Sequence, residues 1–486
     1  MSEKNLAPII REVIKRGYNI SPEALDSLSK AEDPRGLLDQ VLKRADEKGQ
    51  FLLTKEMFEA EGDVAKKVEE TLGVDEAEES QVRVLMDIKI KPTIGLEEDF
   101  LTYFKSRLDK LERLLKKRAD TWGAIQLRDL SRASISGPIK VVGMVSSKRE
   151  GPRSLILNME DRSASTTVIV PSSNPSLFDK GERVLLDEVI CVEGTYRANQ
   201  IIAKDIIWPD IAERRRVGSY QEKALYAILT SDLHLGSKIF LQDAWKRFLD
   251  WLNGGLDMGI NPNVKYLVIA GDIVDGIGVY PNQEKELAIT SVSEQYRVAS
   301  EMLRQIPKHI EIIIIPGNHD AVRQALPQPP IPKDIAKDLY EMKNVHMLSN
   351  PSLVELHGVK LLLYHGNSFD DIVRTHKGMS YKQPSAIMER LLQSRHLAPI
   401  YGESSPIAPE HDDKMVVESD DFDVFHAGHV HVCDHRIYRG RPLVDSGTWQ
   451  LETEYQRRMG ISPTPGLVPV LDLYSLNVFV LDFVSS

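Results

Sequence analysis

Five short clusters of aspartate, asparagine and histidine contain the side chains that could do metal chemistry. The clusters are Asp232-Leu233-His234, Gly271-Asp272-Ile273-Val274-Asp275, Gly317-Asn318-His319-Asp320, Tyr364-His365-Gly366 and Gly428-His429-Val430-His431. Their oxygen and nitrogen donors suit divalent transition ions, and they contain no thiolate of the kind that many structural zinc sites use. One such cluster alone can be an ordinary turn. Five of them in one chain favour a shared metal site over chance.

The spacing within two of the clusters suits the binding of one ion. Asp232 and His234 stand two residues apart, and so do His429 and His431. Side chains at i and i+2 of an extended chain point to the same side, so we expect each pair to reach a single ion. A glycine precedes several of the candidate ligands, which permits the tight turns and close backbone approach that a metal site needs.

Each cluster directly follows an apolar run that predicts a buried β-strand. The runs are 224–229, 264–270, 310–315, 359–363 and 422–425. Ligands of open α/β sheets bind beyond the carboxyl ends of the strands, so we expect all five clusters to converge on one rim. From residue 224 onward the apolar strands alternate with helical stretches, which predicts an α/β layered domain over residues 219–486.

Several segments precede this domain. Residues 1–60 show short amphipathic helical patterns and predict a small helical module, and the acidic segment 61–95 is typical of a linker. Within 96–134, a helix from Glu97 to Arg118 has one apolar face, so we expect it to pack against a neighbour rather than to bind DNA.

The segment 135–210 changes from a helical period to short runs rich in Val, Ile and Leu. Six strand candidates, among them 184–186, are separated in part by turn residues and predict a small antiparallel barrel. An oligonucleotide-binding (OB) barrel is the natural candidate. Two roles stay open for it: it could position DNA or dock a partner, or it could only pack against its neighbours.

Composition limits the class of protein. The 486 residues are 42% hydrophobic and 27% charged, as expected of a soluble globular chain with more than one domain. No apolar run approaches the roughly 20 residues of a membrane span, and the N-terminus lacks the layout of a secretory signal. The two cysteines show no metal-finger spacing. We therefore expect a cytoplasmic protein without a membrane partner.

The formal net charge of -11 argues against a protein that coats nucleic acid by bulk electrostatics. A local patch or a partner would have to supply the positive field for DNA. The C-terminal stretch from Met459 to Phe483 is apolar and strand-like, and it predicts a last strand of the α/β sheet. Part of it could instead face a partner subunit.

The metal clusters resemble the signature of the calcineurin-like metallophosphoesterases, over roughly Tyr226 to Gln450. The resemblance implies a first ion held by Asp232, His234, Asp272 and His431. It implies a second ion held by Asp272, Asn318, His365 and His429. It also implies that His319 is the catalytic acid beside the leaving oxygen. For the two divalent ions we expect manganese, and iron, zinc and nickel stay open because all of them accept these donors.

The order of helical module, OB-like barrel and phosphoesterase domain resembles the small-subunit family of archaeal DNA polymerase D. That family is related to the B subunits of eukaryotic replicative polymerases, in which the metal ligands are lost. Because all ligands are present here, the resemblance implies a 3′-to-5′ proofreading exonuclease that acts on a single-stranded 3′ DNA end. The implied partner is the large catalytic subunit. Two alternatives stay open: a non-catalytic assembly subunit and a stand-alone metal-dependent phosphatase.

Overall fold

The computed structural model describes residues 80–91, 93–131, 137–214, 224–255 and 260–484, with a few isolated positions before residue 54. Those positions include a short parallel pairing of β1 (Asn19–Ile20) with β2 (Leu52–Leu53). The rest of the expected helical module and the first half of the expected linker lie outside the described residues.

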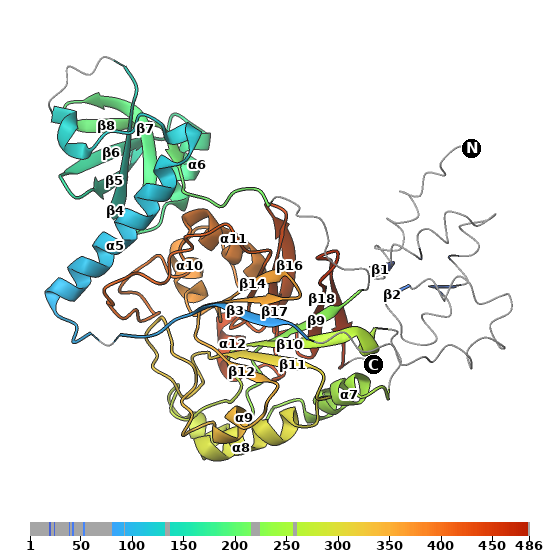
Figure 1. Cartoon of the computed structure of the whole chain (residues 1–486). Helices are drawn as coiled ribbons and strands as arrows, with labels where there is room; N and C mark the ends of the chain where they lie inside the picture. The colour runs from blue at the N-terminus through green and yellow to red at the C-terminus, as the bar shows by residue number, and fades with distance from the viewer. Residues whose placement is uncertain are drawn as a thin grey trace, which may run out of the picture.

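A six-stranded sheet in the order β12-β11-β10-β9-β18-β19 forms one half of a sandwich (Figure 1). Strands β9 to β12 run parallel to their neighbours, whereas β18 pairs antiparallel with β9 and with β19. Every residue of β10 is buried, which explains why a continuous apolar run suits this position. The strands are β9 (Tyr226–Thr230), β10 (Val264–Ala270), β11 (Glu311–Ile315), β12 (Val345–Met347), β18 (Leu467–Asp472) and β19 (Val478–Asp482).

The second six-stranded sheet has the order β16-β17-β15-β14-β13-β3. Its strands are β3 (Val82–Asp87), β13 (Ser352–Leu356), β14 (Val359–Leu363), β15 (Val424–Ala427), β16 (Cys433–Tyr438) and β17 (Arg441–Ser446). Strand β3 lies in the segment that we expected to be a linker. It pairs with β13 at the edge of the sheet and leaves most of its side chains exposed. Its apolar residues Val82, Val84, Leu85 and Met86 indicated a strand, which the acidic start of the segment obscured.

The hydrophobic core has three layers: one between the two sheets, and one between each sheet and the helices that cover its outer face. In the middle layer, Leu229 and Val268 of the first sheet pack against Leu361 and Val444 of the second. This helix-sheet-sheet-helix order confirms the expected α/β class. None of the helices in the described ranges has the length and apolar character needed to cross a bilayer. The covering helices are α7 (Gln242–Leu252), α8 (Val292–Leu303), α9 (Lys337–Tyr340), α10 (Phe369–Thr375) and α11 (Pro384–Ser394).

Five strands between residues 139 and 207 close into a barrel in the order β4-β5-β6-β8-β7. All neighbours are antiparallel except β6 and β8, which run parallel. The expected strand at 184–186 is wrong, because these residues lie in the connection after helix α6 (Pro175–Arg183). The helix begins where it does because Asn174 caps the amide of Leu177 and Pro175 occupies the first turn. The strands are β4 (Ile139–Gly151), β5 (Ser154–Glu160), β6 (Ser165–Pro171), β7 (Val189–Arg197) and β8 (Gln200–Ile207).

Helix α5 (Glu97–Lys116) lies at the junction between the barrel and the sandwich (Figure 1). Its Leu111 packs with barrel residues such as Val142. The fully buried Arg107 donates from Nε to Oδ2 of Asp413 at 2.8 Å and from Nη1 to the carbonyl oxygen of Pro399 at 2.5 Å. The helix therefore packs between two neighbours, as its apolar face predicts.

We expect Arg107→Ala to lower the free energy of unfolding by about 3–5 kcal/mol, since it leaves the buried Asp413 without its cation. Burial raises the pKa of Asp413, but His396 and Arg107 outweigh this effect and hold the pKa well below its usual range. Arg113→Ala is the matched control, because its ion pair with Glu418 is exposed and contributes at most about 1 kcal/mol. Urea unfolding curves that coincide for the two variants would contradict this role of Arg107.

Candidate metal centre

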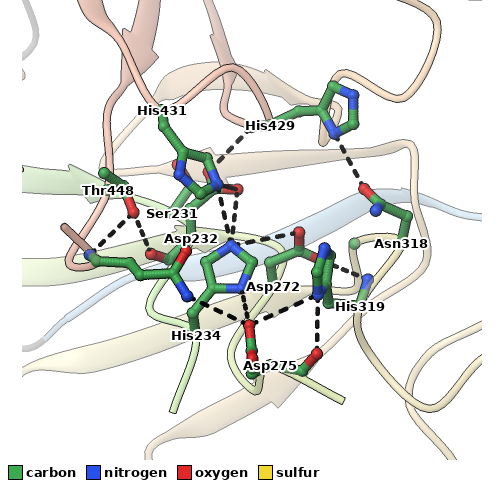
Figure 2. Close-up of polar contacts among 12 residues, drawn as sticks. Ser231, Asp232, His234, Asp272, Asp275, Asn318, His319, His429, His431 and Thr448 are labelled. Atoms are coloured by element: carbon green, nitrogen blue, oxygen red, sulfur yellow. Dashed lines mark hydrogen bonds and ion pairs between the residues drawn. The ribbon is translucent and has the colours of Figure 1, made fainter. Parts of the chain in front are cut away.

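All five polar clusters follow the carboxyl ends of β9, β10, β11, β14 and β15. Strands β9, β10 and β11 are parallel in one sheet, and β14 and β15 are parallel in the other. The structure brings the candidate residues of these loops together at one edge of the sandwich, and Figure 2 shows those that reach it from both sheets.

The backbone at the clusters is not extended. The φ angles of Asp232, His234, Asp272, His429 and His431 are 51°, 50°, 53°, 75° and 65°, all in the left-handed region. The expectation that each i, i+2 pair converges because its chain is extended is therefore wrong. Tight turns bring the side chains together instead, and backbone hydrogen bonds such as Asp232 N–H to the Gly271 carbonyl oxygen (2.9 Å) hold these turns. Such backbone is strained for non-glycine residues and persists only where the surroundings enforce it.

Asp232, His234 and His431 form one group of donors. Nε2 of His431 lies 3.3 Å from Oδ1 of Asp232 and 3.0 Å from Nε2 of His234. Nε2 of His234 lies 3.8 Å from Oδ2 of Asp272. One ion could therefore contact all of these atoms.

Asn318, His365 and His429 form the second group. Oδ1 of Asn318 lies 3.0 Å from Nε2 of His365 and 2.9 Å from Nδ1 of His429. Nε2 of His365 lies 3.3 Å from Oδ2 of Asp272. The same carboxylate oxygen of Asp272 thus faces both groups, so Asp272 could bridge two ions.

The outer nitrogen of each histidine has a partner of its own. Nδ1 of His365 lies 2.7 Å from the carbonyl oxygen of Ala270, and Nδ1 of His234 lies 2.8 Å from Oδ1 of Asp275. Contacts of this kind fix the orientation of an imidazole and direct its other nitrogen at a metal.

Two further partners come from helices. Nδ1 of His431 lies 2.6 Å from the side-chain nitrogen Nε2 of Gln456, and Nε2 of His429 lies 3.3 Å from Oδ2 of Asp370. Sequence reasoning did not assign a role to either partner or to Asp275. Asp275 stands inside one of the polar clusters and could have been considered, whereas Gln456 and Asp370 belong to no motif.

The donor atoms fit divalent cations on two grounds besides their chemistry. Oδ1 of Asp232 is buried and has no hydrogen-bond partner among the described residues, which is unfavourable for a carboxylate unless a cation is near. Nε2 of His234 and Nε2 of His431 face each other at 3.0 Å, where a shared cation could take the place of their mutual hydrogen bond.

Buried acids close to these groups have shifted pKa values. Burial raises the pKa of Asp272, but the nearby His365 and His319 outweigh this and hold it well below its usual range. Burial and the charge of Asp272 together raise the pKa of Asp320 to about 6. Asp320 accepts hydrogen bonds from the amide of Gly317 (2.9 Å) and the hydroxyl of Tyr296 (2.8 Å), so it holds the turn that carries Asn318.

His319 lies beside the two groups. Its Nδ1 donates to the carbonyl oxygen of Asp275 at 2.8 Å, and its Nε2 has no hydrogen bond to any residue in the described ranges. Burial lowers the pKa of His319. His319 is also close enough to His234 and Asp275 to share an ion with them.

Comparison with known proteins identifies the family. A DNA polymerase II small subunit of Methanothermobacter thermautotrophicus is 39% identical over 96% of this chain and 97% of that protein. One of Archaeoglobus fulgidus is 38% identical over 96% of this chain and 95% of that protein. The chain belongs to the family of archaeal DNA polymerase II small subunits. This confirms the small-subunit resemblance that the order of segments suggested.

Two further comparisons agree. The DNA polymerase II small subunit of Pyrococcus furiosus is 41% identical over 79% of this chain, a match that spans 64% of that protein's length. The family of the B subunits of DNA polymerases alpha and epsilon matches residues 227–421. This range contains four of the strands that carry the candidate metal centre: β9, β10 and β11 of the first sheet and β14 of the second.

The contact between Asp275 and His234 leads to a prediction. In Asp275→Asn the amide can present an N–H to Nδ1 of His234, which would move the ring proton to Nε2 and block that nitrogen as a ligand. We expect the affinity for a divalent ion to fall about 10–100-fold, as measured by calorimetric titration of the metal-free chain. Asp243→Asn, at an exposed position of α7, is the control. Equal metal affinities of the two variants would refute the orienting role.

Proposed function

We propose that this chain is a two-metal phosphodiesterase that removes nucleotides from 3′ ends of DNA, as the exonuclease subunit of a DNA polymerase. The observation that carries the proposal is the position of Asp272 between two complete donor groups. Membership in the small-subunit family supplies the DNA context. The complete set of donors disfavours a purely structural assembly subunit, and the family disfavours a stand-alone phosphatase.

The calcineurin-like resemblance assigns the donors to two ions. Asp232, His234, Asp272 and His431 would hold one, and Asp272, Asn318, His365 and His429 would hold the other, with manganese as the expected metal. When bound, such a pair supplies Lewis-acid polarisation of the phosphodiester and an acidified water. The carbonyl of Ala270 and the side chains of Asp275 and Asp370 would keep the imidazoles of His365, His234 and His429 aimed at these positions.

We assign to His319 the transfer of a proton at the leaving 3′ oxygen. Its Nδ1 is fixed on the carbonyl of Asp275, so its Nε2 is the nitrogen available to substrate. Because burial lowers its pKa, His319 is neutral at rest and must take up a proton before it can donate one. A positioned imidazole can also stabilise the charge of the leaving oxygen.

His319→Ala should reduce phosphodiester hydrolysis by about 10²–10⁴-fold while both ions remain bound. The measurements are nuclease rates on single-stranded DNA and the metal content of the purified variant. His435→Ala, at an exposed position of β16, controls for the loss of an imidazole elsewhere. Loss of an ion together with the His319 side chain would show that His319 is a ligand and not the proton donor.

A large catalytic subunit is the partner that the family name implies, and an acidic chain needs a source of positive charge to hold DNA. The C-terminal stretch is a poor candidate for the docking surface, since β18 and β19 complete the first sheet and bury Val470, Leu471 and Phe483. We therefore expect most of the partner's docking surface to lie elsewhere.

We expect the chain to form a stable complex with the large subunit and to degrade DNA faster within it. Size-exclusion chromatography of the mixed subunits and exonuclease assays with and without the large subunit measure both effects. A monomer that ignores the large subunit and shows its full exonuclease rate alone would remove the polymerase context and leave the metal centre untouched.

A further inference from the structure

Helix α12 (Glu454–Met459) is fastened to the metal centre at its first turn. The amide of Gln456 contacts Nδ1 of His431 at 2.6 Å, and a capping box with Thr453 fixes the same side chain: Gln456 Oε1 accepts from the amide of Thr453 at 2.9 Å. The preceding residue, Tyr455, is 57% exposed although it is a large aromatic side chain. A tyrosine ring is thus held at the surface one residue away from a contact of the metal centre.

Helix α10 lies near this ring. Its Asp370 contacts His429 of the second donor group and accepts a hydrogen bond from the hydroxyl of Tyr381 at 2.8 Å. Arg374 stands four residues after Asp370 and therefore on the same face of the helix. Burial raises the pKa of Tyr455, the charge of Asp370 adds to this effect and the charge of Arg374 opposes it, as expected of neighbours. Because Asp370 contacts His429, Tyr455 and Arg374 lie near the side of the centre that His429 forms.

Arg374 differs from the arginines of α12 in having no carboxylate of its own. Arg457 is paired with Glu452, and Arg458 is paired with Glu454. Arg374 is exposed and forms no ion pair with a carboxylate in the described part of the chain. A guanidinium without a fixed acidic partner is available to a phosphate, which it binds with a planar pair of donors.

The aromatic side chains of the barrel are less exposed than Tyr455. Phe178, Tyr196 and Trp208 are partly buried and pack against the barrel core. Bases of a single strand stack on exposed aromatic rings whatever their sequence, because every base has a π-face. Tyr455 provides such a ring close to the metal centre.

We propose that Tyr455 and Arg374 form a subsite for one nucleotide of a single DNA strand next to the scissile phosphate. The ring of Tyr455 stacks on the base, and Arg374 pairs with a phosphate of the same strand. The subsite rests on the proposed phosphodiesterase function and specifies its substrate: a single strand that carries bases, rather than any phosphodiester.

The test compares two strands on the full chain with manganese: oligothymidine, and the same strand with abasic nucleotides at its 3′ end. Tyr455→Ala should lose about fivefold or more in kcat/KM on oligothymidine, mainly through a higher KM. On the abasic strand we expect it to lie within about twofold of the wild type, since there is no base to stack on. Tyr455→Phe should restore the rate on oligothymidine, because it keeps the ring.

The matched control is Tyr474→Ala. Tyr474 is 49% exposed and lies in the turn between β18 and β19, and its neighbour Leu473 bonds to Leu225 just before β9. It is therefore at the end of β9 opposite to the metal centre, and its loss should change neither rate. Arg374→Gln should weaken binding to both strands and reduce the salt dependence of binding.

Binding of the same two strands, measured by fluorescence anisotropy, separates the two proposals. Equal losses of Tyr455→Ala on both strands, or no loss on either, would overturn the subsite. A wild-type chain that cleaves neither strand but still needs Tyr455 to prefer oligothymidine over the abasic strand would overturn the phosphodiesterase function and support the subsite.

Discussion

The buried carboxylate of Asp272 is the group around which the rest of the metal centre is arranged. Its Oδ2 faces Nε2 of His365 at 3.3 Å and Nε2 of His234 at 3.8 Å, while its Oδ1 accepts the amide of His319 at 2.8 Å. A charge removed from water is stable only when it is paired and hydrogen-bonded. The loops after β9, β10, β11 and β14 must therefore all turn inward at this point. Cations at the two donor groups would complete the compensation that the imidazoles begin.

Such close approach of loops depends on the absence of side chains at two positions. A Cβ atom on Gly317 would lie 2.7 Å from Cγ of Asp272, and one on Gly428 would lie 2.5 Å from Oδ2 of Asp232. Either atom would displace a carboxylate that the donor groups need. The same loops hold Asp232 and Asp272 in left-handed backbone. Strained backbone persists where the surrounding structure enforces it, and here the parallel strands and the hydrogen bonds between loops do so.

The strands and the inner donors could be predicted from the sequence because their signals are local. An apolar run followed at once by Asp or His identifies both the strand and the residue at its carboxyl end. The partners of the histidines carry no local signal, since Gln456 reaches His431 from a helix 25 residues further along the chain. The left-handed turns were also beyond prediction, since Asp-x-His is compatible with an extended or a turned backbone. Asn174 and Pro175 were a readable helix start, because Asn as N-cap with Pro in the first turn is typical of one, although we interpreted them as turn residues.

The junction between the barrel and the sandwich depends on buried charges rather than on a flexible linker. Arg107 is paired with Asp413, and Arg390 of α11 is paired with Glu188 of the barrel at 2.5 Å, with all four side chains nearly inaccessible. Replacing buried ion pairs by apolar groups is often neutral for stability, but breaking one is unfavourable, so these pairs act mainly on geometry. Helix α11 also bonds through Ser385 to Asp434 of β16, the strand that follows His431. Contacts thus run from the barrel through α11 to the segment next to the metal centre. A DNA strand or a protein partner that binds the barrel would therefore meet the metal centre at a fixed distance and orientation.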